Sequence, residues 1–256
     1  MTLEEQYSII SKEIDEENQS EMDFLISSHA VAKTNDTNKR VADIVFILDA
    51  TMAEKYKASF VSKLDYYLGE FFCEYSKTGK KLHSLRVSID WFNDTDKIDH
   101  YFGKLPFTSI PDGKSEIDSY FSNLTKFEIK GFRTAMENVC AATDFDWIKN
   151  GDIIRHLVVL ITDHGDSISE IDYKRFFDAW HDNTCSLGTD WRGSLGNMYP
   201  KGKRIIIISP DVYPYNEMGI DFEYLARVDT QYFKVSDDEW EDQIRGTIRL
   251  LADAIR

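Results

Sequence analysis

The sequence predicts an α/β fold: a doubly wound, mostly parallel, six-stranded sheet with helices on both of its faces. Three short runs rich in Val and Ile are mostly apolar, and they lie at residues 42–48, 153–162 and 204–209. Such runs are typical of parallel strands that are buried on both faces. Segments with a helical spacing of apolar residues follow them along the chain. Strands that alternate with helices indicate a doubly wound sheet.

The first half of the domain is expected to hold three strands and a long helix. The strand at 42–48 leads into a helix at 52–75, where an apolar residue recurs every three or four positions. Gly79 is expected to end this helix. A second strand follows at 85–92, and a third, hairpin-like strand at 98–107.

The second half of the domain repeats the alternation of helices and strands. One strand at an edge of the sheet is expected to run antiparallel to the others. The expected elements are helices at 115–124, 132–142, 170–180 and 240–255, strands at 153–162 and 204–209, a short edge strand at 231–235, and a long loop at 181–203.

Composition and charge restrict the partners. The chain has 256 residues, of which 42% are hydrophobic and 13% aromatic, so it can bury a core within a single large domain. Its net charge of −15 argues against nucleic acid and anionic membranes, since both require clustered Lys and Arg. No apolar run approaches the roughly 18 residues that a transmembrane helix needs. We therefore expect a protein partner, with no nucleic acid and no membrane.

The N-terminal region is treated separately from the domain. Residues 1–40 carry helically spaced apolar positions followed by a polar linker, so we expect a helical extension before a domain at 41–256. The extension either packs on the domain or recruits a partner. Its acidic start does not match a signal peptide, which indicates a cytoplasmic protein. Cys73, Cys140 and Cys185 are then expected to be reduced thiols.

Two of the predicted strands end in an acid, and this is the strongest functional signal. Asp49 and Asp163 follow these strands, Thr51 comes two residues after Asp49, and Thr134 lies in a loop that leads into a helix. The carboxyl ends of parallel strands form the binding crevice of an open sheet. Carboxylate and hydroxyl oxygens are suitable ligands for Mg²⁺. These four residues are the candidate metal ligands, although both acids could instead cap the helices that follow them.

Around these residues the sequence resembles the von Willebrand factor A (vWA) family. The segment DIVFILDATMA resembles that family's metal-ion-dependent adhesion site (MIDAS) motif, Asp-x-Ser-x-Ser, with Asp49 and Thr51 in the matching positions. Ala53 replaces the second serine. Thr134 and Asp163 lie where the family carries its loop threonine and its last aspartate. The resemblance implies a vWA/Rossmann-like fold with a degenerate MIDAS.

Three further segments are similar to a group of bacterial cytoplasmic vWA proteins of the stress-response and tellurite-resistance type. They are LRVSIDWFND, GFRTAMENVCAA and KRIIIISPDVYPY. The resemblance implies a non-enzymatic protein-interaction module in bacterial stress response or defence. It also implies that such a module acts beside kinases, phosphatases or ATPases.

The departures from the family pattern leave two states of the site open. In the family the motif hydroxyls bind the metal directly, so Ala53 removes a ligand oxygen. Arg133, next to Thr134, would place a positive charge in the site if it points inward. The site either binds Mg²⁺ with water in the missing position, or works without metal.

An enzymatic alternative uses the same two aspartates as a divalent-metal phosphohydrolase. It would need a nucleophile or a second metal, and the chain offers neither clearly. The segment Asp112–Ser115 lacks the first glycine of a phosphate-binding loop, and His181 and Cys185 lack two further zinc ligands. We therefore expect no enzymatic activity.

Overall fold

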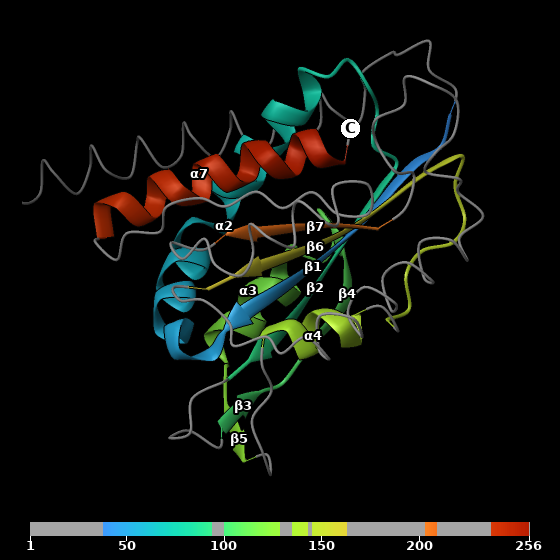
Figure 1. Ribbon diagram of the computed structural model, residues 1–256. Helices are drawn as coiled ribbons and strands as arrows, with labels where there is room; N and C mark the ends of the chain where they lie inside the picture. Colours follow the sequence, from blue (N-terminus) through green and yellow to red (C-terminus); the bar gives the residue numbers. More distant parts are fainter. Residues whose placement is uncertain are drawn as a thin grey trace, which may run out of the picture.

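The computed structural model describes residues 38–93, 100–128, 135–142, 145–162, 203–208 and 237–255, and the account below concerns this part of the chain. A five-stranded sheet with the strand order β4-β2-β1-β6-β7 forms its centre (Figure 1). The strands are β1 (Arg40–Asp49), β2 (Ser84–Phe92), β4 (Leu105–Ile110), β6 (Ile153–Ile161) and β7 (Lys203–Ile208). All neighbours pair in parallel except β4, which runs antiparallel to β2. This confirms an α/β fold with an antiparallel strand beside the parallel ones.

Strand β1 lies in the middle of the sheet because its sequence suits burial on both faces. It pairs with β2 on one side and with β6 on the other, and nine of its ten residues are buried. A central strand needs apolar side chains on both faces, which explains its nearly continuous apolar sequence.

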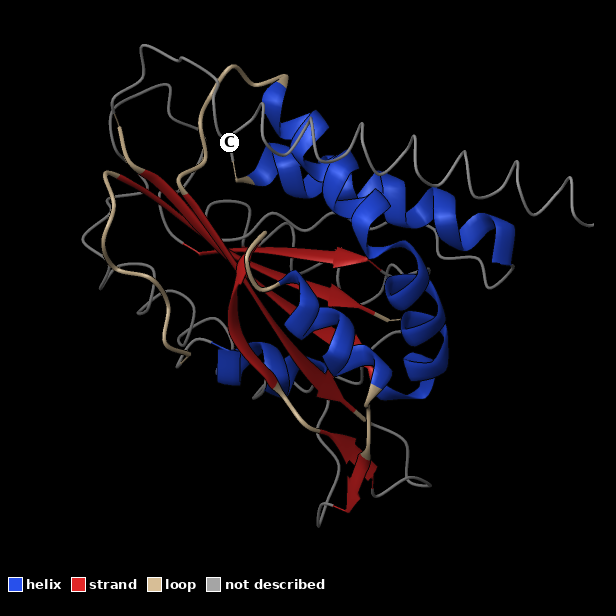
Figure 2. Ribbon diagram, turned by 180° about the vertical axis from the view of Figure 1, so that it is seen from behind, coloured by secondary structure: helices blue, strands red, loops and turns tan. Residues whose placement is uncertain are grey.

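Helices cover both faces of the sheet in the part of the chain that the structure describes. They are α2 (Ala53–Ser76), α3 (Lys114–Ser122), α4 (Ala135–Ala141) and α7 (Asp237–Ala254), and a short 3-10 turn, η1 (Ala50–Met52), precedes α2. Helices α2, α3 and α7 enclose the core on one face. Helix α4 contacts β1, β2 and β6 from the opposite face, as the two views show (Figures 1 and 2).

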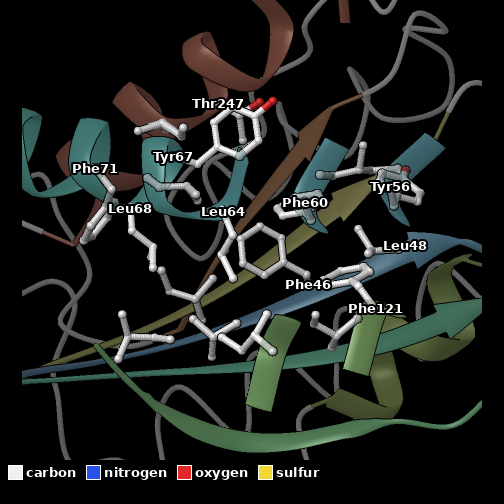
Figure 3. A pocket seen from close by; sticks show the side chains of 18 of the residues that line it. Phe46, Leu48, Tyr56, Phe60, Leu64, Tyr67, Leu68, Phe71, Phe121 and Thr247 are labelled. Carbon is white, nitrogen blue, oxygen red and sulfur yellow. The ribbon is translucent and has the colours of Figure 1, made fainter. Parts of the chain in front are cut away.

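The core between the sheet and helices α2, α3 and α7 is aromatic and contains a cavity of about 100 Å³ (Figure 3). Phe60 of α2 stacks on Phe121 of α3 with ring centroids 5.0 Å apart. Tyr56 meets the edge of Trp91 on β2 at 5.9 Å. Leu48 of β1 and Ile161 of β6 also line this cavity, which places both side chains on the face covered by α2.

A buried ion pair lies near the amino ends of the strands. Asp43 on β1 and Arg86 on β2 are register partners. The Asp43 carboxylate accepts hydrogen bonds from Arg86 Nε at 2.8 Å and from its Nη2 at 2.6 Å. It also accepts one from the backbone N–H of Ile148 at 2.6 Å. The pair therefore ties the segment before β6 to the sheet.

The prediction of one strand at 98–107 was wrong. Two strands lie there: β3 (His100–Phe102) pairs with β5 (Lys126–Glu128) in a separate ribbon, while β4 joins the main sheet. The Tyr120 hydroxyl accepts a hydrogen bond from Trp91 Nε1 and donates one to the carbonyl of Gly103 at 2.6 Å. This contact holds the chain at the break between the two strands.

The other predicted elements within the described residues are confirmed. They are the strands at 42–48, 85–92, 153–162 and 204–209 and the helices at 52–75, 115–124, 132–142 and 240–255, with boundaries that differ by a few residues. Gly79 has φ of +67°, and its N–H donates to the carbonyl of Ser76, as expected of a residue after a helix C-terminus.

Four predictions lie outside the described residues. They are the N-terminal extension at 1–40 up to residue 37, the helix at 170–180, the loop at 181–203 apart from Lys203, which begins β7, and the short edge strand at 231–235. The sixth strand of the sheet therefore stays a prediction. Within the described part, no helix combines the length and the apolar character needed to cross a membrane.

Candidate functional site

Asp49 is the last residue of β1, and its side chain is fully buried. Its Oδ1 atom accepts two hydrogen bonds of 2.8 Å, one from the backbone N–H and one from the hydroxyl of Thr51. Asp49 thus caps η1. Capping, one of the two roles predicted for this acid, is therefore confirmed; ligation of a metal is compatible with it and stays a prediction.

Thr51 lies at the solvent boundary of the same turn. The residue is exposed, whereas Asp49 beside it is buried. Because the Thr51 hydroxyl donates its proton to Asp49, the lone pairs of its oxygen are directed away from the carboxylate. An oxygen in this state can coordinate a hard cation while its proton stays on the carboxylate side.

Ala53 begins α2 and is 5% exposed. Its methyl group adds no oxygen to the turn that Asp49 and Thr51 form. Within this turn, Asp49 and Thr51 therefore supply one carboxylate and one hydroxyl. No group of three or more His, Cys, Asp or Glu side chains suited to a metal occurs among the described residues.

Strand β6 ends at the same edge of the sheet as β1. Leu48 pairs with Ile161 in a parallel ladder, and the N–H of Thr162 continues the sheet by donating to the carbonyl of Ile208 at 3.1 Å. Asp163 follows Thr162 directly in the sequence. Asp163, Thr134 and Arg133 lie outside the described residues. The convergence of all four predicted ligands therefore stays a prediction.

Three buried polar residues that were not among the predicted ligands lie at this edge of the sheet. Asn93, Asn138 and Thr162 are all less than 5% exposed. The Asn138 side-chain amide, on α4, donates to the carbonyl of Trp91 and so joins α4 to the end of β2. The sequence could have indicated these residues, because a polar residue within an apolar strand or on the apolar face of a helix is unusual.

The ammonium group of Lys104 lies near the carboxylate of Asp90 on β2. Asp90 is 5% exposed, and its Oδ1 accepts a hydrogen bond from the N–H of Trp91 at 3.0 Å. The ammonium of Lys104 lies over the ring of Phe145. Partial burial lowers the pKa of Lys104 to about 8, and the charge of Asp90 opposes this shift.

Comparison with known proteins gives similarities of fold only. No protein-family model matches the chain, and no curated protein matches its sequence. Similar solved structures include a von Willebrand factor type A protein from Catenulispora acidiphila, with 13% identity and a TM-score of 0.41 over 84% of this chain and 42% of that protein. The pilus adhesin SpaC from Lactobacillus rhamnosus GG has 9% identity and a TM-score of 0.46 over 86% of this chain and 31% of SpaC.

The PilB minor pilin from Streptococcus sanguinis has 10% identity and a TM-score of 0.46, over 87% of this chain and 63% of the pilin. The chain thus spans less than two thirds of each of these three proteins. Similarities of this degree say nothing about ligands or partners, so the vWA assignment depends on the motifs in the sequence.

Proposed function

We propose that this chain is a non-enzymatic interaction module of the vWA type, which binds a protein partner at the carboxyl edge of its sheet. The observation that carries the proposal is the Asp49–Thr51 turn at the end of the central strand, with β6 ending at the same edge. A buried carboxylate and an exposed hydroxyl, joined at 2.8 Å, form the start of a cation site in the place where open α/β sheets bind ligands.

The donor set fits Mg²⁺ in its chemistry. Asp49 and Thr51 would hold the ion, and Thr134 and Asp163 are proposed to complete the protein ligands. Bound Mg²⁺ would supply a Lewis acid that accepts a carboxylate oxygen of the partner. The protein's own part is to orient the Asp49 carboxylate, which its two hydrogen bonds from Thr51 favour.

We place this activity in the bacterial cytoplasm, in stress response or defence, with a kinase, phosphatase or ATPase of the same system as the partner. The resemblance of three sequence segments to cytoplasmic vWA proteins supports this context. The net charge of −15 supports a protein partner over nucleic acid or an anionic membrane.

The test combines titration of the full chain with Mg²⁺ and Mn²⁺ and capture of partners from a bacterial lysate. Asp49→Ala should abolish metal binding and capture of the partner. Asp65→Ala is the matched control, since Asp65 is a half-exposed acid of α2 that pairs with Lys114. It should leave both unchanged.

Two outcomes separate the alternatives. Capture that survives EDTA but is lost in Asp49→Ala indicates an interaction module that works without metal. Hydrolysis of a generic phosphomonoester that is abolished by Asp49→Ala contradicts the interaction module and favours the phosphohydrolase.

A further inference from the structure

The cavity of about 100 Å³ in the core plays no part in the function proposed above (Figure 3). Side chains of β1, β2, β4 and β6 line it from the sheet, and side chains of α2, α3 and α7 line it from the other side. Leu64 of α2, Phe121 of α3 and Leu251 of α7 are among the helix residues that contact this space. Segments that are distant in the sequence therefore enclose it together.

The lining of the cavity is almost wholly apolar in the part of the chain that the structure describes. The Tyr56 hydroxyl donates to the carbonyl of Ile161 at 3.3 Å, and the hydroxyls of Tyr67 and Ser59 lie 2.8 Å apart. The other described lining residue with a polar side chain is Thr247 of α7. A buried water needs two to four polar partners, whereas an apolar guest gains dispersion contacts from such a lining. The cavity therefore suits an apolar molecule better than water.

Aromatic rings form much of the lining on the side of α2 and α3. Phe60 stacks on Phe121 with ring centroids 5.0 Å apart and 5° between the ring planes. Tyr56 and Tyr67 line the same space (Figure 3). Aromatic rings attract one another in offset-stacked and edge-to-face arrangements, beyond the effect of the buried area. A flat aromatic guest therefore gains more from this lining than an aliphatic molecule of the same size.

The volume of the cavity limits the guest to a single ring. Engineered protein cavities of roughly 150 Å³ that are lined by Leu, Ile and Phe bind benzene and xenon. A cavity of about 100 Å³ is of the same order but smaller, so two fused rings are too large for it. We propose that this cavity is a binding site for a small apolar molecule with one aromatic ring. The proposal goes beyond the proposed function and does not depend on the Asp49 site.

Titration of the full chain with benzene and with phenol tests the proposal, and EDTA is present so that no metal contributes. Benzene should bind with a dissociation constant on the order of 1 mM. Phenol should bind at least about ten-fold more weakly, because its hydroxyl gives up hydrogen bonds with water. Benzene at ten times its dissociation constant should raise the ratio of folded to unfolded chain about ten-fold. No binding of benzene, or equal affinity for phenol, would overturn the proposal.

Two substitutions on α2 show whether benzene occupies the cavity. Leu64→Phe places a ring in this space, so it should weaken benzene binding by about ten-fold or more. Val61→Phe is the matched control, since it adds the same ring to the same helix at a residue that is 38% exposed. It should leave the affinity unchanged within about two-fold. Benzene affinity that is equal in wild type and Leu64→Phe would place the guest elsewhere and refute the proposal.

Xenon locates the site without any substitution. Xenon is apolar and enters cavities of this kind, so crystals of the unaltered chain under xenon pressure should show an anomalous peak between Leu64 and Phe121. Crystals that diffract well and show no peak there would overturn the proposal, even if benzene binds the chain. Neither probe involves Asp49, so failure of this proposal leaves the proposed metal site standing, and failure of metal binding leaves this proposal standing.

Discussion

At the scale of single residues, the proposed MIDAS lacks one oxygen of the family motif. Asp49 and Thr51 are joined at 2.8 Å, and the third motif position is the methyl group of Ala53. A serine at this position would start the same helix and add a hydroxyl to the same turn. A substitution at Ala53 should therefore change the affinity of the proposed site for a divalent cation.

Ala53→Ser should strengthen Mg²⁺ and Mn²⁺ binding by roughly ten-fold, because one more protein oxygen replaces a water in the coordination shell. Isothermal titration of the full chain provides the measurement. Ala58→Ser is the matched control, since Ala58 is an exposed residue of the same helix. An affinity that rises equally in the control, or in neither variant, would contradict the account of the site.

The ion pair of Asp43 and Arg86 should contribute more to stability than a pair on the surface. Arg86→Ala leaves a buried carboxylate without its cation and should destabilise the protein by about 3 kcal/mol in chemical denaturation. Lys77→Ala removes an exposed partner of Glu74 and should destabilise the protein far less than Arg86→Ala does. Similar losses of stability in the two variants would contradict a strong contribution from the buried Asp43 carboxylate.

Lys104 should titrate near pH 8 in the folded protein, because partial burial disfavours its charged form. The unfolded chain, with an ordinary lysine pKa near 10.5, then binds more protons between about pH 8 and 10.5. This group therefore makes stability rise with pH in that window. NMR of the Lys104 side chain checks the midpoint. Phe145→Ala should move it toward 10.5, and a midpoint already there would contradict the effect of burial.

The residues of the candidate site were predictable to different degrees. Asp49 and Thr51 follow an apolar run directly, so their place at the end of a strand could be predicted from the sequence. The neighbour relation of Asp49 with Thr162 could not, because it depends on β1 lying beside β6 in a particular register. The pairing of Asp43 with Arg86 was missed for the same reason.

At the scale of elements, the predictions succeeded where the apolar period is long. Strands β1, β2, β6 and β7 and helix α2 bury continuous faces, and burial of this kind leaves a strong pattern. The three-residue strands β3 and β5 leave none. The break between β3 and β4 is set by contacts of Tyr120 with residues distant in the sequence, so no local pattern marks it.

The contact between α2 and the sheet leaves room for a larger side chain. Leu64 of α2 lines the cavity and is 8% exposed (Figure 3). Leu64→Phe should fill part of this space and raise the free energy of unfolding by about 0.5 kcal/mol. Leu82 is equally buried but does not line the cavity, so Leu82→Phe should destabilise the protein by about 1 kcal/mol or more. Thermal unfolding of both variants measures the difference. Destabilisation by Leu64→Phe would contradict the presence of usable space.

At the scale of the whole molecule, the order of strands explains why one edge should carry the function. With β1 between β2 and β6, and all three parallel, their carboxyl ends meet at one place. The loops that leave this edge determine what is bound there, while the rest of the sheet serves as a rigid support. The apolar core supports this edge, and the net charge of −15 disfavours polyanionic partners.

The metal-binding form of the proposal depends on the claim that this edge of the sheet binds a divalent cation through Asp49 and Thr51. Crystals of the full chain soaked in Mn²⁺ test it most directly, by anomalous scattering. We predict a single strong peak about 2.2 Å from the hydroxyl of Thr51, with the Asp49 carboxylate binding the ion directly or through one water. Crystals that diffract well and show no peak at this edge would contradict the claim.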